Sequence, residues 1–452
     1  MDFAQLKTLC EFEKGSTGLA KAEPGDYPLV TTGAERRTCE TYQFDAKAVC
    51  IPLVSSTGHG HASLKNVHYQ EGKFALGSIL VALTSKDANT LDIQFLHLYL
   101  SQLKDEVLVP LMSGAANVAL SVKKIQDIEI PLPSILLQRE IVQRFKSIVI
   151  EENELKSELT QQQTLLKKLR QRILQEAIEG KLTTDWRTQN PNIEPASELL
   201  KRITAEKAKL IKDKKIKTQK LLPPIADEEK PFDLPDGWEW CRLGSLVETL
   251  SGNNFLSTDF KKDDGVKCIK ITNAGVNYII ETEERLPHQF LEKYKRYIVN
   301  AGDIILALTR PYVADGLKVS ICPRSYDKSL LNQRVAVIRP SNQFLEREYC
   351  YLFLRSDYVL NGYKAEFDSK GQQPNLKNEH ITNLIFPCPP RFEQQVIVTK
   401  VEKLLFLCDQ LETQISQNQI HAEQLMQAVL SEAFRHNSEA EQTAIPKATA
   451  HA

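Results

Sequence analysis

Two stretches of fourteen residues decide the fold: LSVKKIQDIEIPLP at 120–133 and LKNEHITNLIFPCP at 376–389. They align without a gap at a constant offset of 256, which takes Leu120 to Leu376, and both end in a Pro-x-Pro sequence. Self-similarity at a fixed offset is typical of a duplicated architecture. The sequence therefore predicts two homologous halves.

The segments upstream of these stretches also match. GSILVALT at 77–84 aligns with GDIILALT at 302–309, and LKTL at 6–9 aligns with LGSL at 243–246, with offsets that differ by loop lengths. We expect each half to begin with a mixed α/β domain. Helices are predicted at 95–100 and 346–354. Short apolar runs bounded by Gly, Pro, Asn or Ser predict strands at 48–54, 79–83, 266–271, 304–308 and 334–338.

The pattern becomes helical directly after each Pro-x-Pro, because proline ends a strand and tolerates a helix start. Apolar residues then recur in alternating steps of four and three, which is a heptad seam. In the first half the seam is Ile141, Phe145, Ile148, Glu152, Leu155, Leu159, Gln162, Leu166, Leu169, Ile173 and Glu176. The same offset gives Ile397, Val401, Leu404, Cys408, Leu411, Ile415, Asn418, Ala422, Leu425, Val429 and Glu432 in the second half.

Two helices with matching apolar stripes are expected to pack together as a coiled coil. The polar breaks coincide, since Gln162 corresponds to Asn418 and Glu176 to Glu432, and a buried amide commonly fixes register. The alternative is that each helix lies on its own domain. A helix from Ile141 to Glu176 would span about 54 Å at ~1.5 Å per residue, more than one DNA turn of ~34 Å.

Composition is that of an ordinary soluble protein with several domains. Of the 452 residues, 42% are apolar and 25% charged, and no stretch approaches the ~20 apolar residues of a membrane span. The opening residues lack a secretory signal, so we expect a cytoplasmic chain with reduced cysteines and no role at a membrane. The net charge of -1 leaves nucleic acid open as a partner, because basic surfaces can be local.

The sequence lacks the motifs that would indicate catalysis. No Gly-x-x-x-x-Gly-Lys-Ser/Thr phosphate loop occurs, and no Asn/Asp-Pro-Pro-Tyr run that would hold a flipped base. No two of the nine cysteines have zinc-knuckle spacing, and the TGHGH run at 57–61 has no cysteine or carboxylate at ligand spacing. We expect neither a catalytic residue nor a metal site in this chain.

A basic segment separates the halves. From Lys201 to Lys220 there are nine basic residues against Glu206 and Asp213, a local charge of +7. A solvated helical linker and a phosphate-contacting surface explain this run equally well.

The chain resembles the specificity subunits of type I restriction-modification systems over essentially its whole length. The resemblance is carried by SSTGHGHAS at 55–63, HYQEGK at 68–73, GKLTTDWR at 180–187, LPDGW at 234–238, LNQR at 331–334 and GQQPNL at 371–376. Two places depart from the family pattern. The second helix ends in FRHN at 434–437 instead of Gly-Lys-Leu-Thr, and the GAAN loop at 114–117 aligns with Gly371 only after a shift of one residue.

The resemblance implies an α+β fold in which two target-recognition domains are separated by two long helices, packed as an antiparallel coiled coil with pseudo-two-fold symmetry. Each domain would read one half of a bipartite, adenine-containing DNA target, and the helices would set the gap. The expected segments are 1–134 and 236–390 for the recognition domains, 135–180 and 391–436 for the helices, 181–235 for the linker and 437–452 for a flexible tail.

The resemblance also implies partners that would bring the chemistry. Two methyltransferase subunits would supply S-adenosylmethionine, and a restriction subunit would supply ATP- and Mg-dependent translocation. Three alternatives stay open: a coiled-coil scaffold that binds proteins without reading DNA, an enzyme with a diverged site, and a DNA reader in a methylation-only or phage-exclusion system.

Residues that read DNA use amide and guanidinium groups on base edges, with hydroxyls and lysines on phosphates. On that basis the candidates in the first domain are Arg36, Arg37, Ser55, Ser56, Thr57, His59, His61 and Lys86. In the second domain they are Asn253, Asn254, Lys261, Lys262, Asn273, Arg310, Asn332, Gln333, Gln372 and Gln373. A role in stabilising loops is the competing interpretation for each of them.

Overall fold

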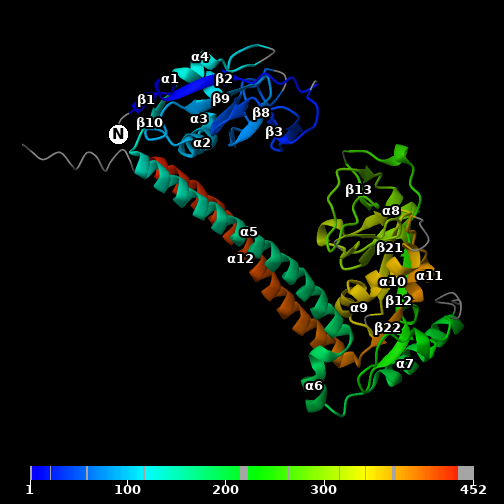
Figure 1. The fold of residues 1–452 in the computed structure, drawn as a ribbon. Helices are drawn as coiled ribbons and strands as arrows, with labels where there is room; N and C mark the ends of the chain where they lie inside the picture. Colours follow the sequence, from blue (N-terminus) through cyan, green and yellow to red (C-terminus); the bar gives the residue numbers. More distant parts are fainter. Residues whose placement is uncertain are drawn as a thin grey trace, which may run out of the picture. The chain divides into compact units, whose positions relative to one another are not determined.

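The structure is a computed structural model, and it describes residues 3–20, 22–57, 60–115, 118–213, 222–262, 264–314, 316–341, 343–368 and 373–435. The chain divides into two compact units (Figure 1). The first unit contains Met1–Thr160 with Ser416–Ala452, and the second contains Gln161–Ile415. Each unit therefore has the same make-up: one α/β domain, the start of the helix that follows it, and the end of the other long helix.

The long helices are α5, Ile135–Ile178, and α12, Arg391–Arg435. At ~1.5 Å per residue each is about 66 Å long. Both begin just after the prolines that end a strand, as predicted. After α5, Gly180 adopts the left-handed conformation at φ 71°, which is the usual way for a glycine to stop a helix.

The two helices run antiparallel, and the second unit shows this directly. Arg170 of α5 pairs with Asp409 at 2.6 Å and Glu412 at 2.9 Å on α12. Further along the chain, the Leu182 carbonyl accepts from Lys400 Nζ at 2.9 Å. Residue numbers along α12 therefore fall as residue numbers rise along α5 and into the segment that follows it. The coiled coil is antiparallel, as expected.

The predicted seam is only half right. Every seventh residue is buried, at Leu159, Leu166 and Ile173 on α5 and at Val401, Cys408 and Ile415 on α12. Four other leucines of the predicted seam are exposed, with Leu155 40%, Leu169 45%, Leu411 46% and Leu425 66% accessible. On α5 the half-buried Gln163 and Arg170 lie four residues after the buried Leu159 and Leu166. The seam therefore rotates to the other flank of the stripe.

This rotation overturns the prediction of buried polar breaks. Gln162 and Asn418 are both exposed, so neither amide fixes register inside the seam. Ile141 and Ile397 are buried, and Phe145, Ile148 and Leu404 are half-buried. The side chains of Val429 and Glu432 lie outside the described residues.

The first domain stacks two four-stranded sheets and a helix. The large sheet has the order β2 (Cys10–Lys14), β9 (Leu80–Ser85), β6 (Ala48–Pro52), β7 (His68–Gln70). The small sheet has the order β4 (Arg37–Cys39), β3 (Tyr27–Val30), β8 (Lys73–Leu76), β5 (Phe44–Asp45). Helix α2 (Ile93–Gln102) follows β9.

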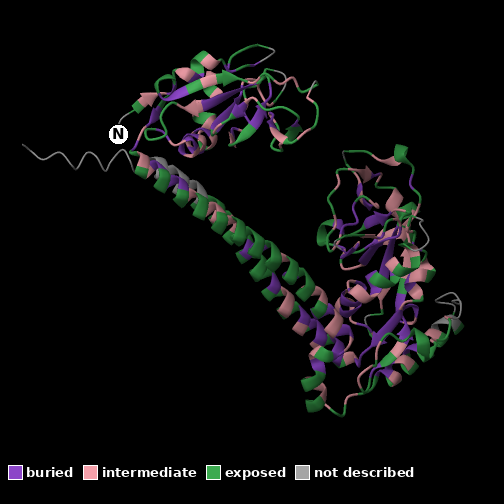
Figure 2. Cartoon of the chain, viewed as in Figure 1, coloured by how far each residue is buried: buried purple, intermediate pink, exposed green. Residues whose placement is uncertain are grey.

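The large sheet is covered on both faces, so its central strands are continuous apolar runs. Val49, Ile51 and Leu83 belong to the same core as Leu96 of α2. Their neighbours in sequence, including Cys50 and Ala82, pack into a second core with Phe74 and Leu76 of the small sheet. This alternation follows from the two-residue period of a strand, and Figure 2 shows the buried strands inside each domain.

The second domain repeats this plan. Its large sheet has the order β12 (Val247–Ser251), β21 (Val335–Pro340), β16 (Ile304–Ala307), β19 (Val319–Ile321). Its small sheet has the order β14 (Arg285–Leu286), β13 (Val266–Ile269), β20 (Ser329–Leu331), β15 (Ile298–Val299). Helix α9 (Arg347–Leu354) follows β21, and α10 spans Asp357–Phe367. The predicted strands and both predicted helices are confirmed.

The sheet orders correct one predicted alignment. GSILVALT at 77–84 leads into β9, whereas GDIILALT at 302–309 leads into β16. In the sheets β9 corresponds to β21 and β6 to β16. The mistake arose because β9 and β16 have similar apolar sequences while being adjacent strands of the shared frame.

The fourteen-residue repeat forms the same structure twice. It contains α4 (Val122–Gln126) and β10 (Glu129–Pro131) in the first half, and α11 (Asn378–Thr382) and β22 (Ile385–Cys388) in the second. Each of these strands pairs antiparallel with the start of its domain, β1 (Phe3–Gln5) or β11 (Glu239–Arg242). Between the halves lie α6 (Thr184–Gln189) and α7 (Ala196–Lys212). Among the described residues, every helix is too short or too polar to span a lipid bilayer.

Candidate nucleic-acid interface

In the first domain two loops meet where β6 ends. The amide of Ser55 donates to the Val118 carbonyl at 3.0 Å, and the amide of Leu120 donates to the Leu53 carbonyl at 2.9 Å. Gly60, at φ 79°, lies so close to the second loop that a Cβ there would be 2.8 Å from the Ala115 oxygen. The described parts of 55–65 and 113–119 therefore form one surface, which we call the first loop pair.

The hydroxyl groups in this pair hold the loop in shape. Ser55 Oγ donates to the His61 carbonyl at 2.6 Å, and Ser56 Oγ accepts from the Lys65 amide at 2.9 Å. Thr57 and His61 are exposed. The structure thus gives Ser55 and Ser56 a loop-stabilising role. Thr57 Oγ1 also donates to the His61 carbonyl, at a longer distance of 3.4 Å, and both Thr57 and His61 are accessible to a ligand. His59 lies outside the described residues.

The second domain builds the same junction from different residues. The amide of Arg310 donates to the Pro374 carbonyl at 3.0 Å, and the amide of Leu376 donates to the Leu308 carbonyl at 2.7 Å. Arg310 therefore occupies the place of Ser55. Gln373 is exposed beside it, and we call the described residues of 309–318 and 373–376 the second loop pair. Gln372 lies outside the described residues.

Arg310 has an unusual backbone. Its φ is 48°, one of three positive values among non-glycine residues that the structure describes, and Pro311 follows it. A left-handed conformation costs an L-residue about 1–2 kcal/mol, and such strain gathers at functional sites. The side chain is exposed, and its guanidinium has no partner among the described residues. The loop therefore presents a free arginine from a fixed backbone.

Four more candidates lie at this edge of the second sheet. The amide of Asn253 donates to the Leu331 carbonyl at 2.9 Å, and Asn253 forms a bridge with Asn332. The turn that contains Asn332 and Gln333 reaches β16, since the Leu308 amide donates to the Arg334 carbonyl. Gln333 and Asn254 are exposed. The structure thus brings Asn253, Asn254, Asn332 and Gln333 to the edge where Arg310 and Gln373 lie.

Other candidates lie elsewhere or are committed to the fold. Lys86 follows the opposite end of β9, because Pro52 pairs with Leu80 whereas Ala48 pairs with Thr84, and its ammonium donates to the Lys7 carbonyl. The prediction that Asn273 contacts DNA is wrong. Its side chain is 2% exposed, and its amide group bonds Lys270 and Ile280 within a turn. Lys261 pairs through its backbone with Arg285. Arg37 and Lys262 are exposed.

Arg36 is fixed inside the first domain. Its guanidinium donates to Gln70 Oε1 at 2.9 Å and to the Tyr69 carbonyl at 3.1 Å, and it contacts His68 Nδ1 at 3.1 Å. Burial, helped by the Arg36 charge, lowers the pKa of His68 to about 4. These contacts give Arg36 a structural role, so it is not free to contact a base.

The sequence reasoning missed a pair of buried glutamines, one at the start of each long helix. Gln138 Nε2 donates to the Pro133 carbonyl at 2.8 Å and the Thr90 carbonyl at 2.9 Å, and its Oε1 accepts from the Asp92 amide at 2.8 Å. Gln394 repeats all three bonds with Pro389, Phe344 and Glu346, at 3.1, 3.3 and 2.8 Å. Both side chains are fully buried. The signal was present, because the two glutamines are 256 residues apart.

The second unit has a further contact, made by a buried carboxylate. No equivalent contact occurs among the described residues of the first unit. Glu393 is 1% exposed and accepts from Thr183 Oγ1 at 2.6 Å, Arg187 Nη1 at 2.5 Å and Trp238 Nε1 at 2.9 Å. These residues form the Glu393 network, which ties α12 to the segment after α5 and to the start of the second domain. At the matching position of α5 stands Leu137.

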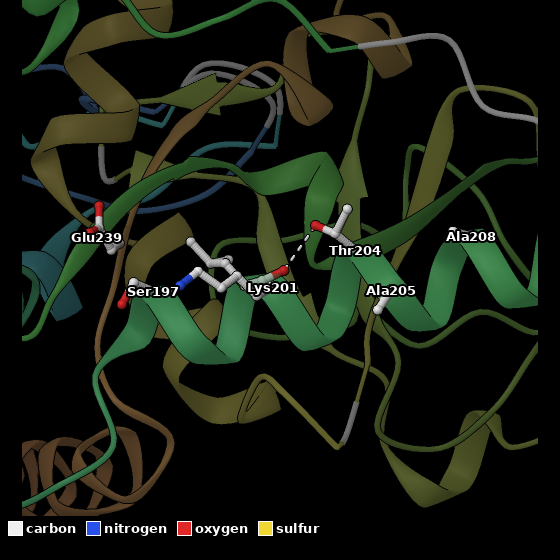
Figure 3. Close-up of a pocket in the computed structure, with 7 residues that line it drawn as sticks. Ser197, Lys201, Thr204, Ala205, Ala208 and Glu239 are labelled. Carbon is white, nitrogen blue, oxygen red and sulfur yellow. Dashed lines mark hydrogen bonds between the residues drawn. The ribbon is translucent and has the colours of Figure 1, made fainter.

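A shallow groove of about 570 Å³ lies along one face of α7 (Figure 3). Ser197, Lys201, Thr204, Ala205 and Ala208 line it from the helix, and Glu239 lines it from β11. Only the first part of the basic run is described, because residues 214–221 lie outside the described residues. Within the described ranges, no three His, Cys, Asp or Glu side chains gather as metal ligands would.

Curated relatives are specificity subunits of type I restriction enzymes. The EcoAI subunit of Escherichia coli is 38% identical over 56% of this chain and 42% of the relative, and the EcoEI subunit is 31% identical over 58% and 45%. The matched part of the chain thus spans less than half the length of these two relatives. The EcoDI subunit is 24% identical over 94% of the chain and 87% of the relative.

Solved structures show the same fold. A chain from a structural study of assembly and conformational transition in a type I R-M system superposes with a TM-score of 0.61 at 15% identity, over 96% of this chain and 97% of that one. The HsdS subunit from Thermoanaerobacter tengcongensis gives a TM-score of 0.57 at 16% identity, over 96% of both chains. The family model described as "Type I restriction modification DNA specificity domain" matches residues 1–163 and 235–421, so the chain belongs to this family.

Proposed function

We propose that the chain is the DNA-recognition subunit of a type I restriction-modification complex, and that each domain reads one half of a bipartite target through its loop pair. One observation carries this proposal. The two loop pairs are anchored by equivalent backbone hydrogen bonds, from Ser55 to Val118 and from Arg310 to Pro374. They nevertheless present different side chains. A common frame with unlike loops is what two different half-sites require.

Within the second loop pair, Arg310 is the residue we assign to a base. Arginine donates in bidentate fashion to the O6 and N7 atoms of guanine, the commonest specific contact in the major groove. A phosphate contact needs no strained backbone, whereas a contact to a base edge must be held within about 0.5 Å of the productive geometry. The fixed backbone and free guanidinium of Arg310 favour the base contact.

The long helices are proposed to set the gap between half-sites and to dock methyltransferase subunits. Large apolar side chains stay exposed along them, including Leu165 at 54% and Ile420 at 54%, which supports a protein partner on this surface. The methyltransferase would bring S-adenosylmethionine, and a restriction subunit would bring ATP and Mg. In this proposal the chain itself performs no chemical step, and it acts in the cytoplasm, where its DNA lies.

Selection from a pool of random duplexes tests the proposal, using the full chain assembled with its methyltransferase. The wild type should enrich a bipartite sequence. Arg310→Ala should relax one guanine in one half-site, with a loss of about 1–3 kcal/mol there. Arg324→Ala is the matched control, because Arg324 is an exposed arginine beyond the other end of β16. Equal weakening on all sequences would indicate a phosphate contact, and no enrichment by the wild type would refute DNA readout.

A further inference from the structure

Each recognition domain meets its long helix through one repeated contact. We call it the glutamine joint: Gln138 with Thr90, Asp92 and Pro133, and Gln394 with Phe344, Glu346 and Pro389. All three bonds of each joint go to backbone atoms. The bonds therefore depend on where the chain runs and not on which side chains the domain presents.

The joint connects elements whose angle matters. Asp92 and Glu346 lie directly before α2 and α9, the helices that pack beneath the large sheets. Pro133 and Pro389 lie where the repeat strand gives way to α5 or α12. One side chain thus fixes the domain, the incoming strand and the first turn of the long helix at a single point.

Burial makes this point stiff. Both glutamines are 0% exposed, so water cannot replace a broken bond, and a buried polar group left without a partner is strongly disfavoured. A domain that swung on its helix would have to break these bonds. An apolar residue in the same place would pack without selecting one direction, because apolar contacts are not directional.

From this geometry we propose that Gln138 and Gln394 are positioning residues for spacer discrimination: they fix the angle of each recognition domain on its helix and thereby restrict the complex to one gap between half-sites. This inference rests on the proposed function. The helices supply the length of the spacer, and the joints decide how strictly that length is enforced.

The two joints are not equally supported. The Glu393 network holds the second domain at a further point, through Trp238 at its entry, whereas Leu137 stands at the matching position in the first half. Loss of Gln394 therefore leaves a buried directional contact in place. After loss of Gln138 the first domain keeps surface contacts with α5, from Lys146 to Gln94 at 2.7 Å and from Arg139 to Asp92 at 3.8 Å. The larger effect is expected from Gln138.

The test maps methylated adenines in a host that carries the full chain and its methyltransferase. Gln138→Leu should raise the modified fraction of sites whose spacer is one base pair longer or shorter by about tenfold, as expected when buried hydrogen bonds stop opposing a displaced domain. Gln394→Leu should raise it less. Gln143→Leu and Gln395→Leu are the controls, because both glutamines are exposed on the same helices.

A stability role alone is separable from this role. It would lower modification at all sites while keeping a single spacer length, and that result would overturn the inference. If Gln138→Leu fails to accumulate, Gln138→Asn keeps the amide but shortens its reach, and the same widening of spacer length is expected. Strict spacing in that variant contradicts the inference. If the wild type modifies no bipartite site, the proposed function fails instead.

Discussion

The two recognition domains share a frame but differ in what they attach to it. Their large and small sheets have the same strand order, and the glutamine joints match bond for bond. The loop junction carries Ser55 in one domain and Arg310 in the other, and the Glu393 network accompanies the second domain. The shared frame and its glutamine joints position both domains in the same way. The loops differ because they read different half-sites, and the extra contacts of the second domain add stability.

The largest loss of stability is expected when the Glu393 network is removed. Glu393→Leu introduces the residue found at the matching place in α5 and leaves Arg187 without its carboxylate, which typically costs about 3–5 kcal/mol. Hydrogen exchange should become faster around Trp238 and the first turns of α12, with no change in the first domain. Glu402→Leu, at an exposed site on α12, is the control.

The double variant Glu393→Leu with Arg187→Leu should recover part of this loss, because the unpaired charge is gone. If the single variant exchanged hydrogen as slowly as the wild type, the second domain would not be held more firmly than the first.

The next effect belongs to the first domain, where His68 takes the strand position of Ser320. With a pKa lowered from 6.5 to about 4, folded His68 stays neutral while the unfolded chain takes up a proton. Stability is therefore full above pH 6.5 and falls by about 3 kcal/mol as the pH drops to 4. Hydrogen exchange in the first domain, measured across this range, should follow that slope.

His68→Gln should flatten this slope by up to one proton, and the second domain should not change. A slope that survived the substitution would assign the pH dependence to other groups, such as the half-buried His97, whose pKa desolvation also lowers.

A smaller effect is expected at Ser55. Its hydroxyl holds the loop through the His61 carbonyl, so Ser55→Ala should weaken binding at the first half-site by about 1 kcal/mol, the usual value of one such bond. Recognition of the second half-site should stay the same in a competition assay. A loss in both half-sites would show that the loop pairs are not independent.

The smallest effect sharpens the role of Arg310. Glycine adopts a φ of 48° without strain, and this gain exceeds the entropy that glycine adds to the unfolded chain by about 0.5 kcal/mol. Arg310→Gly should therefore be slightly more stable in thermal unfolding while losing the guanine preference. A destabilised variant would mean that the arginine stabilises the loop and that its strain has no functional meaning.

Much of the frame could be predicted from the sequence, because strands and amphipathic helices have local patterns. The constant offset from Leu120 to Leu376 placed both helices and both repeat strands. The pairing of GSILVALT with GDIILALT was wrong because fully buried strands look alike, and only hydrogen bonds between strands separate β9 from β21. The seam rotated because an antiparallel partner chooses among flanks of one apolar stripe, and a single helix sequence contains no partner.

The candidate site was predictable as a region and less so as a set of atoms. Arg310 and Gln373 lie together because two loops far apart in sequence meet at the end of β16. Asn273 is an exposed-looking amide in the sequence, yet a turn uses its whole side chain. The burial of Gln138 and Gln394 was not predicted, because a polar residue in a helix is usually exposed to solvent. Their burial depends on how the domain packs against the helix.

The central claim is that two unlike loop pairs on one repeated frame read two half-sites. It is tested most directly by mapping methylated adenines for the wild type, Thr57→Ala and Arg310→Ala, each with the methyltransferase partner. We expect one bipartite motif for the wild type, degraded in one half by Thr57→Ala and in the other half by Arg310→Ala. An uninterrupted motif, or variants that degrade the same half, would contradict it.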